Sequence, residues 1–225
     1  FDINTGEPKS SGKNFSAAFG EVMCKFAQKD SRICCVTAAM AEGTGLCNFA
    51  KQYPKRFFDV GIAEQHAVTF SSGLARNGLV PVFAVYSTFL QRSYDQLIHD
   101  VAMQNLKVIF AIDRAGFVGE DGESHQGVFD TSFLNSVVGL TVYAPSTFDE
   151  LEAMFYQGIY KTDGAVAIRY PRGGQFEIPV EYTYNHENYT IIGNENAKKC
   201  IVSYGREFSE CAKAYENLSL SLIHI

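Results

Sequence analysis

Residues 57–92 have the sequence FFDVGIAEQHAVTFSSGLARNGLVPVFAVYSTFLQR, and this stretch decides the expected fold class. Apolar residues recur at helical spacing between 62 and 76, and an unbroken apolar run follows at 79–86. The first pattern predicts a helix that packs along one face, and the second predicts a strand that is covered on both faces. A helix followed directly by a buried strand is typical of α/β folds.

The same alternation extends to both sides of this stretch. Before it, the pattern predicts a helix over 16–28 and strands over 32–38 and 56–60. After it, a helix capped by Ser87 or Thr88 is expected to extend to Val101. Further on, the pattern predicts strands at 106–113, 141–144 and 165–170 and a helix at 148–160. We therefore expect an α/β domain over 15–174 with a doubly wound, mainly parallel sheet and helices on both faces.

The two ends of the chain differ from this pattern. Residues 1–14 have the Gly, Ser and Pro content of a linker, and 175–197 mix polar and aromatic residues without a period, as a connector does. A new strand and helix over 198–219 are expected to begin a second domain. The last residues, LSLIHI at 220–225, match a translated sequencing adapter, and we interpret them as a non-native tail. The chain is therefore expected to be a fragment of a longer protein.

Composition narrows the class of protein and of partner. Hydrophobic residues make up 46% of the chain and charged residues 20%, which are ordinary globular values. The net charge of -6 argues against nucleic acid or an anionic membrane as the main partner. Six cysteines without metal-ligand spacing, and no apolar run long enough to span a membrane, favour reduced thiols in a cytoplasmic protein.

Three long motifs carry a family resemblance: DVGIAEQHAV at 59–68, YSTFLQRSYDQ at 86–96 and DRAGFVGEDGESHQGVFD at 113–130. Together they resemble the pyrimidine-binding domain of the 1-deoxy-D-xylulose-5-phosphate synthase family. The members of this family are thiamine-diphosphate enzymes of the transketolase superfamily. The resemblance spans roughly residues 32–173. It implies a transferase that condenses pyruvate with D-glyceraldehyde 3-phosphate, releases CO2 and works as a homodimer in isoprenoid and thiamine biosynthesis.

Glu64 is the first candidate catalytic residue. A carboxylate in the first turn of an apolar helix, at the end of a strand, lies where α/β folds gather their chemistry. The resemblance implies that Glu64 bonds the aminopyrimidine ring of thiamine diphosphate, that Phe89 stacks on this ring and that Ile62 completes the cofactor site. Taken alone, Glu64 also fits an exposed residue favoured by the helix dipole, and Phe89 also fits a core residue.

Arginines are the candidate anion-binding residues. Arg92, Arg114 and Arg172 each follow the carboxyl end of a predicted strand, and guanidinium groups bind carboxylate or phosphate with paired hydrogen bonds. The resemblance assigns Tyr86, Arg92 and Arg172 to the acceptor phosphate and to closure of the active site. It assigns Arg114 to the substrate carboxylate.

Asp121 and His125 are the remaining candidate catalytic residues. They lie four apart in GEDGESHQG, a loop whose glycines let side chains approach a ligand closely. A histidine transfers protons near neutral pH, and a nearby carboxylate orients it. The family motif around both residues implies a place in the active site, whereas a loop Asp and His alone are more often exposed to solvent.

One departure from the family limits these expectations. The family holds the cofactor diphosphate and Mg2+ with a G-D-G motif on a preceding domain, and this chain contains no such motif. No metal ligand is therefore assigned, and the chain alone is expected to be inactive. Its site residues should still converge at one edge of the sheet. A docking surface around Ile62, Ala63, Val85, Tyr86 and Phe89 should be exposed.

Two alternatives remain open beside this interpretation. A transketolase-like or 2-oxoacid dehydrogenase β-subunit chain would share the fold and the glutamate. A non-catalytic module would keep the fold and lose the chemistry. The 86–96 motif and the loop with Asp121 and His125 favour the first interpretation over the transketolase-like chain. Against the non-catalytic module stands the presence of Glu64, Asp121, His125 and the three arginines.

Overall fold

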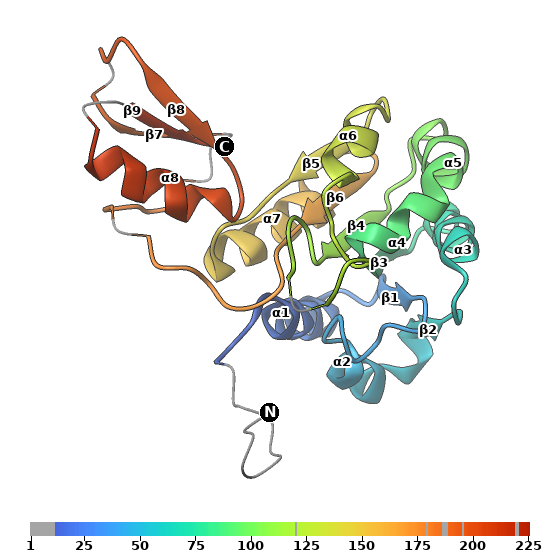
Figure 1. The fold of residues 1–225 in the computed structure, drawn as a ribbon. Coiled ribbons are helices and arrows are strands. Elements are labelled where there is room, and N and C mark those ends of the chain that lie inside the picture. The colour runs from blue at the N-terminus through green and yellow to red at the C-terminus, as the bar shows by residue number, and fades with distance from the viewer. Residues whose placement is uncertain (1–11, 120, 179, 186–188, 195, 219–220) are drawn as a thin grey trace.

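The structure is a computed structural model that describes residues 12–119, 121–178, 180–185, 189–194, 196–218 and 221–225 (Figure 1). Its helices and strands follow in the order α1 (Phe15–Lys29), β1 (Ile33–Thr37), α2 (Cys47–Gln52), η1 (Pro54–Arg56), β2 (Phe57–Asp59), α3 (Glu64–Arg76), β3 (Val80–Tyr86), α4 (Ser87–Leu90), η2 (Gln91–Ser93), α5 (Tyr94–Gln96), η3 (Leu97–Ala102), β4 (Ile109–Asp113), α6 (Asp130–Asn135), β5 (Thr141–Tyr143), α7 (Phe148–Tyr160), β6 (Val166–Arg169), β7 (Thr190–Gly193), β8 (Cys200–Ser203), α8 (Glu207–Glu216) and β9 (Ser221–His224).

Six strands form one sheet in the order β2-β1-β3-β4-β6-β5. All five pairings between neighbours are parallel. The carboxyl ends of these strands therefore lie along one edge. The sheet confirms the predicted α/β class.

Helices cover both faces of this sheet, because successive strand residues point to opposite sides. On one face, Val82, Ala84 and Ile109 belong to a core cluster with residues of α1, α2 and α7. On the other face, Phe83, Val85 and their neighbours pack with α3, α6 and the 87–102 segment. Figure 1 shows this layered arrangement, which confirms the predicted double winding.

The 87–102 segment differs from the single helix that the sequence predicts. It consists of the short pieces α4, η2 and α5 followed by the π-helical turn η3. Ser93 leaves helical geometry at φ -107 and ψ 17. The predicted cap is also wrong, because Tyr86 occupies the N-cap position and makes no side-chain cap bond. Single π-helical turns are rare and occur frequently at functional sites.

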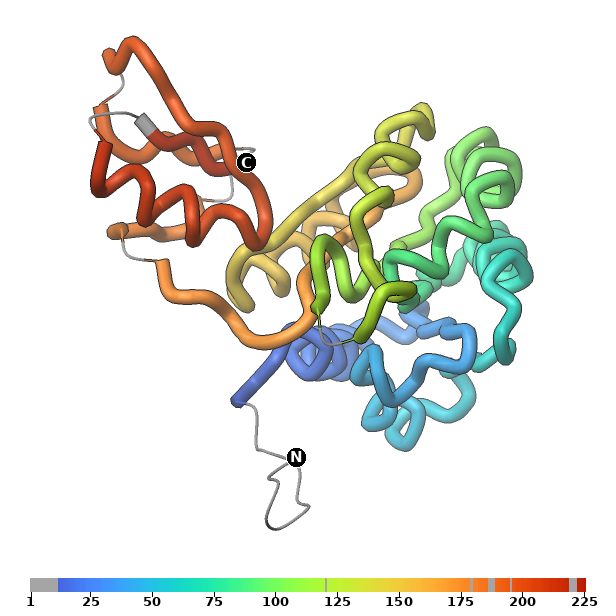
Figure 2. The backbone as a smooth tube through the Cα atoms, viewed as in Figure 1, coloured from blue at the N-terminus to red at the C-terminus, as the bar shows by residue number. Residues whose placement is uncertain are grey.

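A second, smaller unit follows residue 174 (Figure 2). It contains a three-stranded sheet in the order β7-β9-β8, in which β7 and β9 are antiparallel and β8 and β9 are parallel. Phe208 and Ala212 of α8 pack against Leu222 of β9. Strand β7 lies within the predicted connector, so that stretch is not wholly irregular.

The predictions of an N-terminal linker and of a non-native C-terminal tail stay untested. Of the predicted linker, residues 1–11 lie outside the described residues. The predicted tail contributes the central strand β9, and its proposed adapter origin stays a hypothesis. Within the described residues, no helix has the length and hydropathy needed to cross a membrane.

Candidate active site

The candidate residues lie at the carboxyl edge of the six-stranded sheet. Glu64 is the first residue of α3, which follows β2, and Tyr86 is the last residue of β3. Asp113 ends β4, and Arg172 follows β6 by three residues. Because these strands are parallel, their ends bring residues from distant parts of the sequence to one place.

Glu64 is buried, with 2% of its surface exposed. Its Oε2 accepts a hydrogen bond from Arg92 Nη1 at 3.3 Å, and Arg92 is its one hydrogen-bond partner among the described residues. The Arg92 side chain itself is half exposed, at 53%. A buried carboxyl group with an uncommitted oxygen is able to share a proton with a ligand nitrogen.

Phe89 presents its ring between two other candidate residues. Its ring centre lies 6.0 Å from that of Tyr86, with 20° between the planes. The His125 ring meets Phe89 edge-on at 5.2 Å, and the Arg92 guanidinium carbon lies 5.7 Å from the Phe89 centre. Phe89 therefore joins the Glu64 side of the site to the loop that carries His125.

Arg114 is the most heavily bonded cation of the site. Its Nη1 donates to the Gly43 carbonyl at 2.7 Å and lies 3.1 Å from Asp113 Oδ1, and its Nε donates to Asp121 Oδ2 at 3.2 Å. The guanidinium also lies 3.9 Å from the Tyr86 ring centre. Its backbone has φ 57, an uncommon conformation for a residue with a Cβ, which concentrates at functional sites.

Asp121 links two of the predicted arginines. Its Oδ1 lies 3.2 Å from Arg172 Nε, while Oδ2 faces Arg114. The loop that carries Asp121 is closed by paired backbone hydrogen bonds between Gly116 and Gly127. In the same loop, His125 Nδ1 lies 2.8 Å from Ser124 Oγ. Asp121 thus pairs with both guanidinium groups and keeps them close to each other.

Two residues of the site were missed by the sequence reasoning. Asp113 is fully buried, accepts a hydrogen bond from Ser16 Oγ at 2.7 Å, and its pKa is raised to about 6 by burial although Arg114 opposes this shift. Gly43, in the loop after β1, approaches Tyr86 so closely that a Cβ there would lie 1.7 Å from the Tyr86 hydroxyl. The available signal for Asp113 was an acid ending an apolar strand.

The expected exposed surface is correct at some positions and wrong at one. Ile62 is 77% exposed, and Ala63, Tyr86 and Phe89 are partly exposed. Val85 is fully buried because it points into the core beneath α3 and α6. The prediction that Val85 is exposed is therefore wrong.

The described residues fit one half of thiamine diphosphate. Glu64 offers a buried acid for a ring nitrogen, and Phe89 offers a partly exposed aromatic face. For the diphosphate half, the described part of the chain contains no group of three acidic, His or Cys residues placed to hold a metal ion. The residues present therefore suit the aminopyrimidine end.

Comparison with known families is consistent with this geometry. The family model for the transketolase pyrimidine-binding domain matches residues 11–175. The chain belongs to this family.

Curated relatives give a finer likeness. A 1-deoxy-D-xylulose-5-phosphate synthase from Symbiobacterium thermophilum is 56% identical over 183 residues, which cover 81% of this chain and 28% of the relative. The enzyme of the same name from an Enterobacter strain is 47% identical over 227 residues, which cover 99% of this chain and 37% of the relative. The chain thus spans about a third of the length of these relatives.

Solved structures share the fold. A chain described as split gene transketolase, inactive β4 tetramer, matches with a TM-score of 0.79 and 23% identity over 95% of this chain and 71% of its own length. Transketolase from Leishmania mexicana matches with a TM-score of 0.81 and 16% identity over 99% of this chain and 35% of its own. At these identities the likeness concerns the fold alone.

Proposed function

We propose that this chain is the pyrimidine-binding part of a 1-deoxy-D-xylulose-5-phosphate synthase. The full enzyme would condense pyruvate with D-glyceraldehyde 3-phosphate and release CO2. The observation that carries the proposal is Glu64, a carboxyl group with 2% exposure at the carboxyl edge of the sheet, bonded to Arg92 through one oxygen. The relatives with 47–56% identity support the choice of this enzyme within the family.

Thiamine diphosphate, when bound, supplies the carbon nucleophile that side chains lack. Glu64 would hold a proton at the ring nitrogen, and its burial keeps water from competing for that proton. Arg92 keeps the carboxyl group oriented from the other side. Phe89 would support the ring through its apolar face, and Ile62 would extend that surface into the open part of the site.

The acceptor and donor substrates are both anions, which matches the arginines at the site. Tyr86, Arg92 and Arg172 would bind the acceptor phosphate, and Arg114 the substrate carboxylate. Asp121 would hold Arg114 and Arg172 in place. His125, with its ring against Phe89, would carry protons to and from the reacting groups.

The rest of the enzyme lies outside this chain in the proposal. Mg2+ and the diphosphate would be held by residues of a preceding domain, and the working unit would be a cytoplasmic homodimer that supplies isoprenoid and thiamine precursors. The chain alone would then be inactive.

Reconstitution tests the proposal. The purified chain, given thiamine diphosphate, Mg2+, pyruvate and D-glyceraldehyde 3-phosphate, should release no CO2 above background. Adding or grafting the preceding part of a relative should restore CO2 release and form 1-deoxy-D-xylulose 5-phosphate. Release of CO2 by the chain alone would contradict the assignment of the diphosphate site. Activity of the graft only with ketose phosphate donors would favour the transketolase-like alternative.

A further inference from the structure

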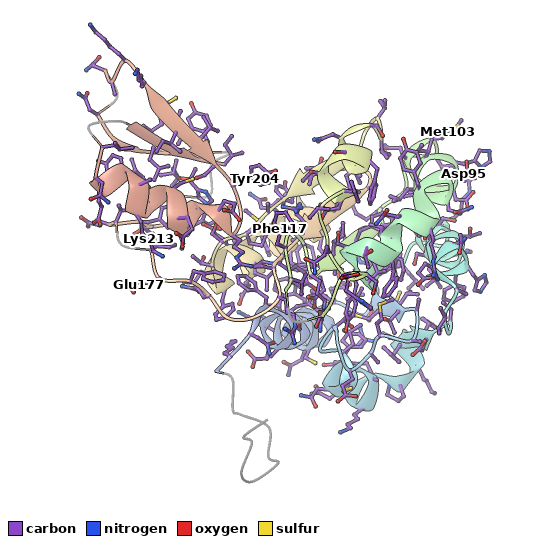
Figure 3. All side chains as sticks on the ribbon, in the orientation of Figure 1. Asp95, Met103, Phe117, Glu177, Tyr204 and Lys213 are labelled. Carbon is purple, nitrogen blue, oxygen red and sulfur yellow. The ribbon has the colours of Figure 1, made fainter. Side chains whose placement is uncertain are left out.

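Arg206 stands directly before α8 in the second unit, yet its side chain reaches the candidate active site. Its Nη1 donates a hydrogen bond to the Phe117 carbonyl oxygen at 3.0 Å. Its guanidinium carbon also lies 4.7 Å from the centre of the Phe176 ring. Phe117 belongs to the loop that carries Asp121 and His125, and Figure 3 shows Phe117 near Tyr204 at the junction of the two units.

A cavity of about 630 Å³ opens between these elements. Its lining includes Arg114, Arg172 and Arg206, so three guanidinium groups from three parts of the chain share one space. Backbone of the Gly43 loop and the first residues of α1 complete the wall, and Glu42 contributes an exposed carboxylate.

The three arginines differ in how far their charge is compensated. Arg114 is shared between Asp113 and Asp121, and Arg172 also pairs with Asp121. Arg206 has no ion pair with a carboxylate in the described part of the chain. Glu210, one turn further along α8, forms its ion pair with Lys213, although Arg206 also attracts this carboxylate electrostatically. Arg206 therefore brings to the cavity a positive charge that no carboxylate among the described residues pairs with, and it has N–H donors beyond the one used by Phe117.

We propose that Arg206 is a specificity-determining residue that binds the phosphate end of the acceptor. This inference rests on the proposed function and adds to it a residue from the second unit, outside the three family motifs. A phosphate monoester carries close to two negative charges at neutral pH, and a planar guanidinium donates two parallel hydrogen bonds to it. The contact with the Phe176 ring lies at the same cavity, whose lining includes both residues.

Binding of a charged and a neutral aldehyde by the 225-residue chain tests the inference. D-glyceraldehyde 3-phosphate and D-glyceraldehyde are titrated calorimetrically against the chain and three variants. Arg206→Gln should weaken binding of the phosphate by about tenfold, the effect of one charge-assisted contact, and Arg206→Lys should weaken it less because the charge remains. Lys213→Gln, a matched charge loss on α8, should change it by less than about twofold. Neutral aldehyde binding should stay the same in all of them.

Several results would overturn the inference. One is that the unchanged chain does not bind D-glyceraldehyde 3-phosphate. A second is that Arg206→Gln and Lys213→Gln weaken its binding equally. A third is that Arg206→Gln and Arg206→Lys weaken its binding equally, which would indicate that Arg206 positions the loop. If only the Arg206 inference is wrong, the reconstituted enzyme still turns over. If phosphate binding depends on Arg206 but the reconstituted enzyme does not turn over, the proposed function is wrong.

Discussion

Asp113 is the buried carboxylate that supports the uncommon backbone conformation of Arg114. Its carboxylate accepts hydrogen bonds from Ser16 Oγ and from the Arg114 backbone N–H, the latter at 2.7 Å. These bonds support Arg114 in its left-handed conformation. The fully buried carboxylate costs stability when ionised, which is why its pKa is raised to about 6.

The raised pKa predicts a pH effect on stability. The folded state binds the Asp113 proton more tightly than the unfolded state, whose ordinary value is 3.8, so stability from this group is present at low pH and is lost as pH rises toward 6. Between about pH 4.5 and 7.5 the wild type should lose about 2 kcal/mol of unfolding free energy relative to Asp113→Asn. Urea unfolding of both proteins at several pH values measures this. A constant difference across that range would contradict the assigned cause.

Some individual site residues could be predicted from the sequence and others could not. The motifs place six candidate residues at one edge: Glu64, Phe89, Arg92, Asp121, His125 and Arg172. Contacts link the first three with His125, and Asp121 with Arg172. Arg114 and Tyr86 connect these two groups. Their roles stay predictions. Gly43 and Ser16 could not be anticipated, because their contacts with Tyr86 and Asp113 depend on how α1 and the loop after β1 pack.

Hydrophobic periodicity predicted helices and strands well wherever the element packs along its whole length. Helices α1 and α7 and strands β3 and β4 lie close to their predicted ranges because their apolar residues face a continuous core. The 87–102 segment is an exception. Its apolar residues continue at helical spacing past Ser93, so the pattern gives no sign of the break at this residue, where η2 ends. The short α2 and α6 offered too few turns to show a period.

The loop after β1 makes a testable prediction at this scale. Gly43→Ala would place a Cβ against the Tyr86 hydroxyl, so the loop or Tyr86 must shift, and the unfolding free energy should fall by about 1–3 kcal/mol. Gly73→Ala is the matched control, because a methyl group added to Gly73 in α3 meets nothing within 4 Å, and this variant should gain about 0.5–1 kcal/mol. Chemical denaturation of both variants gives the comparison. Equal behaviour of the two variants would contradict the close approach.

The junction between the six-stranded domain and the smaller unit contains polar contacts as well as packing. Ser146 Oγ donates to the Gly205 carbonyl at 2.6 Å, and Tyr182 of the segment before β7 bonds the buried Glu150 of α7. The hydrogen bond from Arg206 to Phe117 belongs to the same junction. The sequence predicted two units but not this contact, because the partners are more than thirty positions apart and follow no period.

The most direct measurement concerns Glu64 in the reconstituted enzyme. The chain grafted to the preceding part of a relative is assayed for 1-deoxy-D-xylulose 5-phosphate from pyruvate and D-glyceraldehyde 3-phosphate, with Glu64→Gln and Glu21→Gln compared. Glu21 is an exposed acid on α1 that pairs with Lys13, so its variant controls for charge loss. We expect Glu64→Gln to lower turnover by at least about a hundredfold, as loss of an acid–base group does, and Glu21→Gln to leave it unchanged. Full turnover by a correctly folded Glu64→Gln graft would contradict the acid–base role of Glu64.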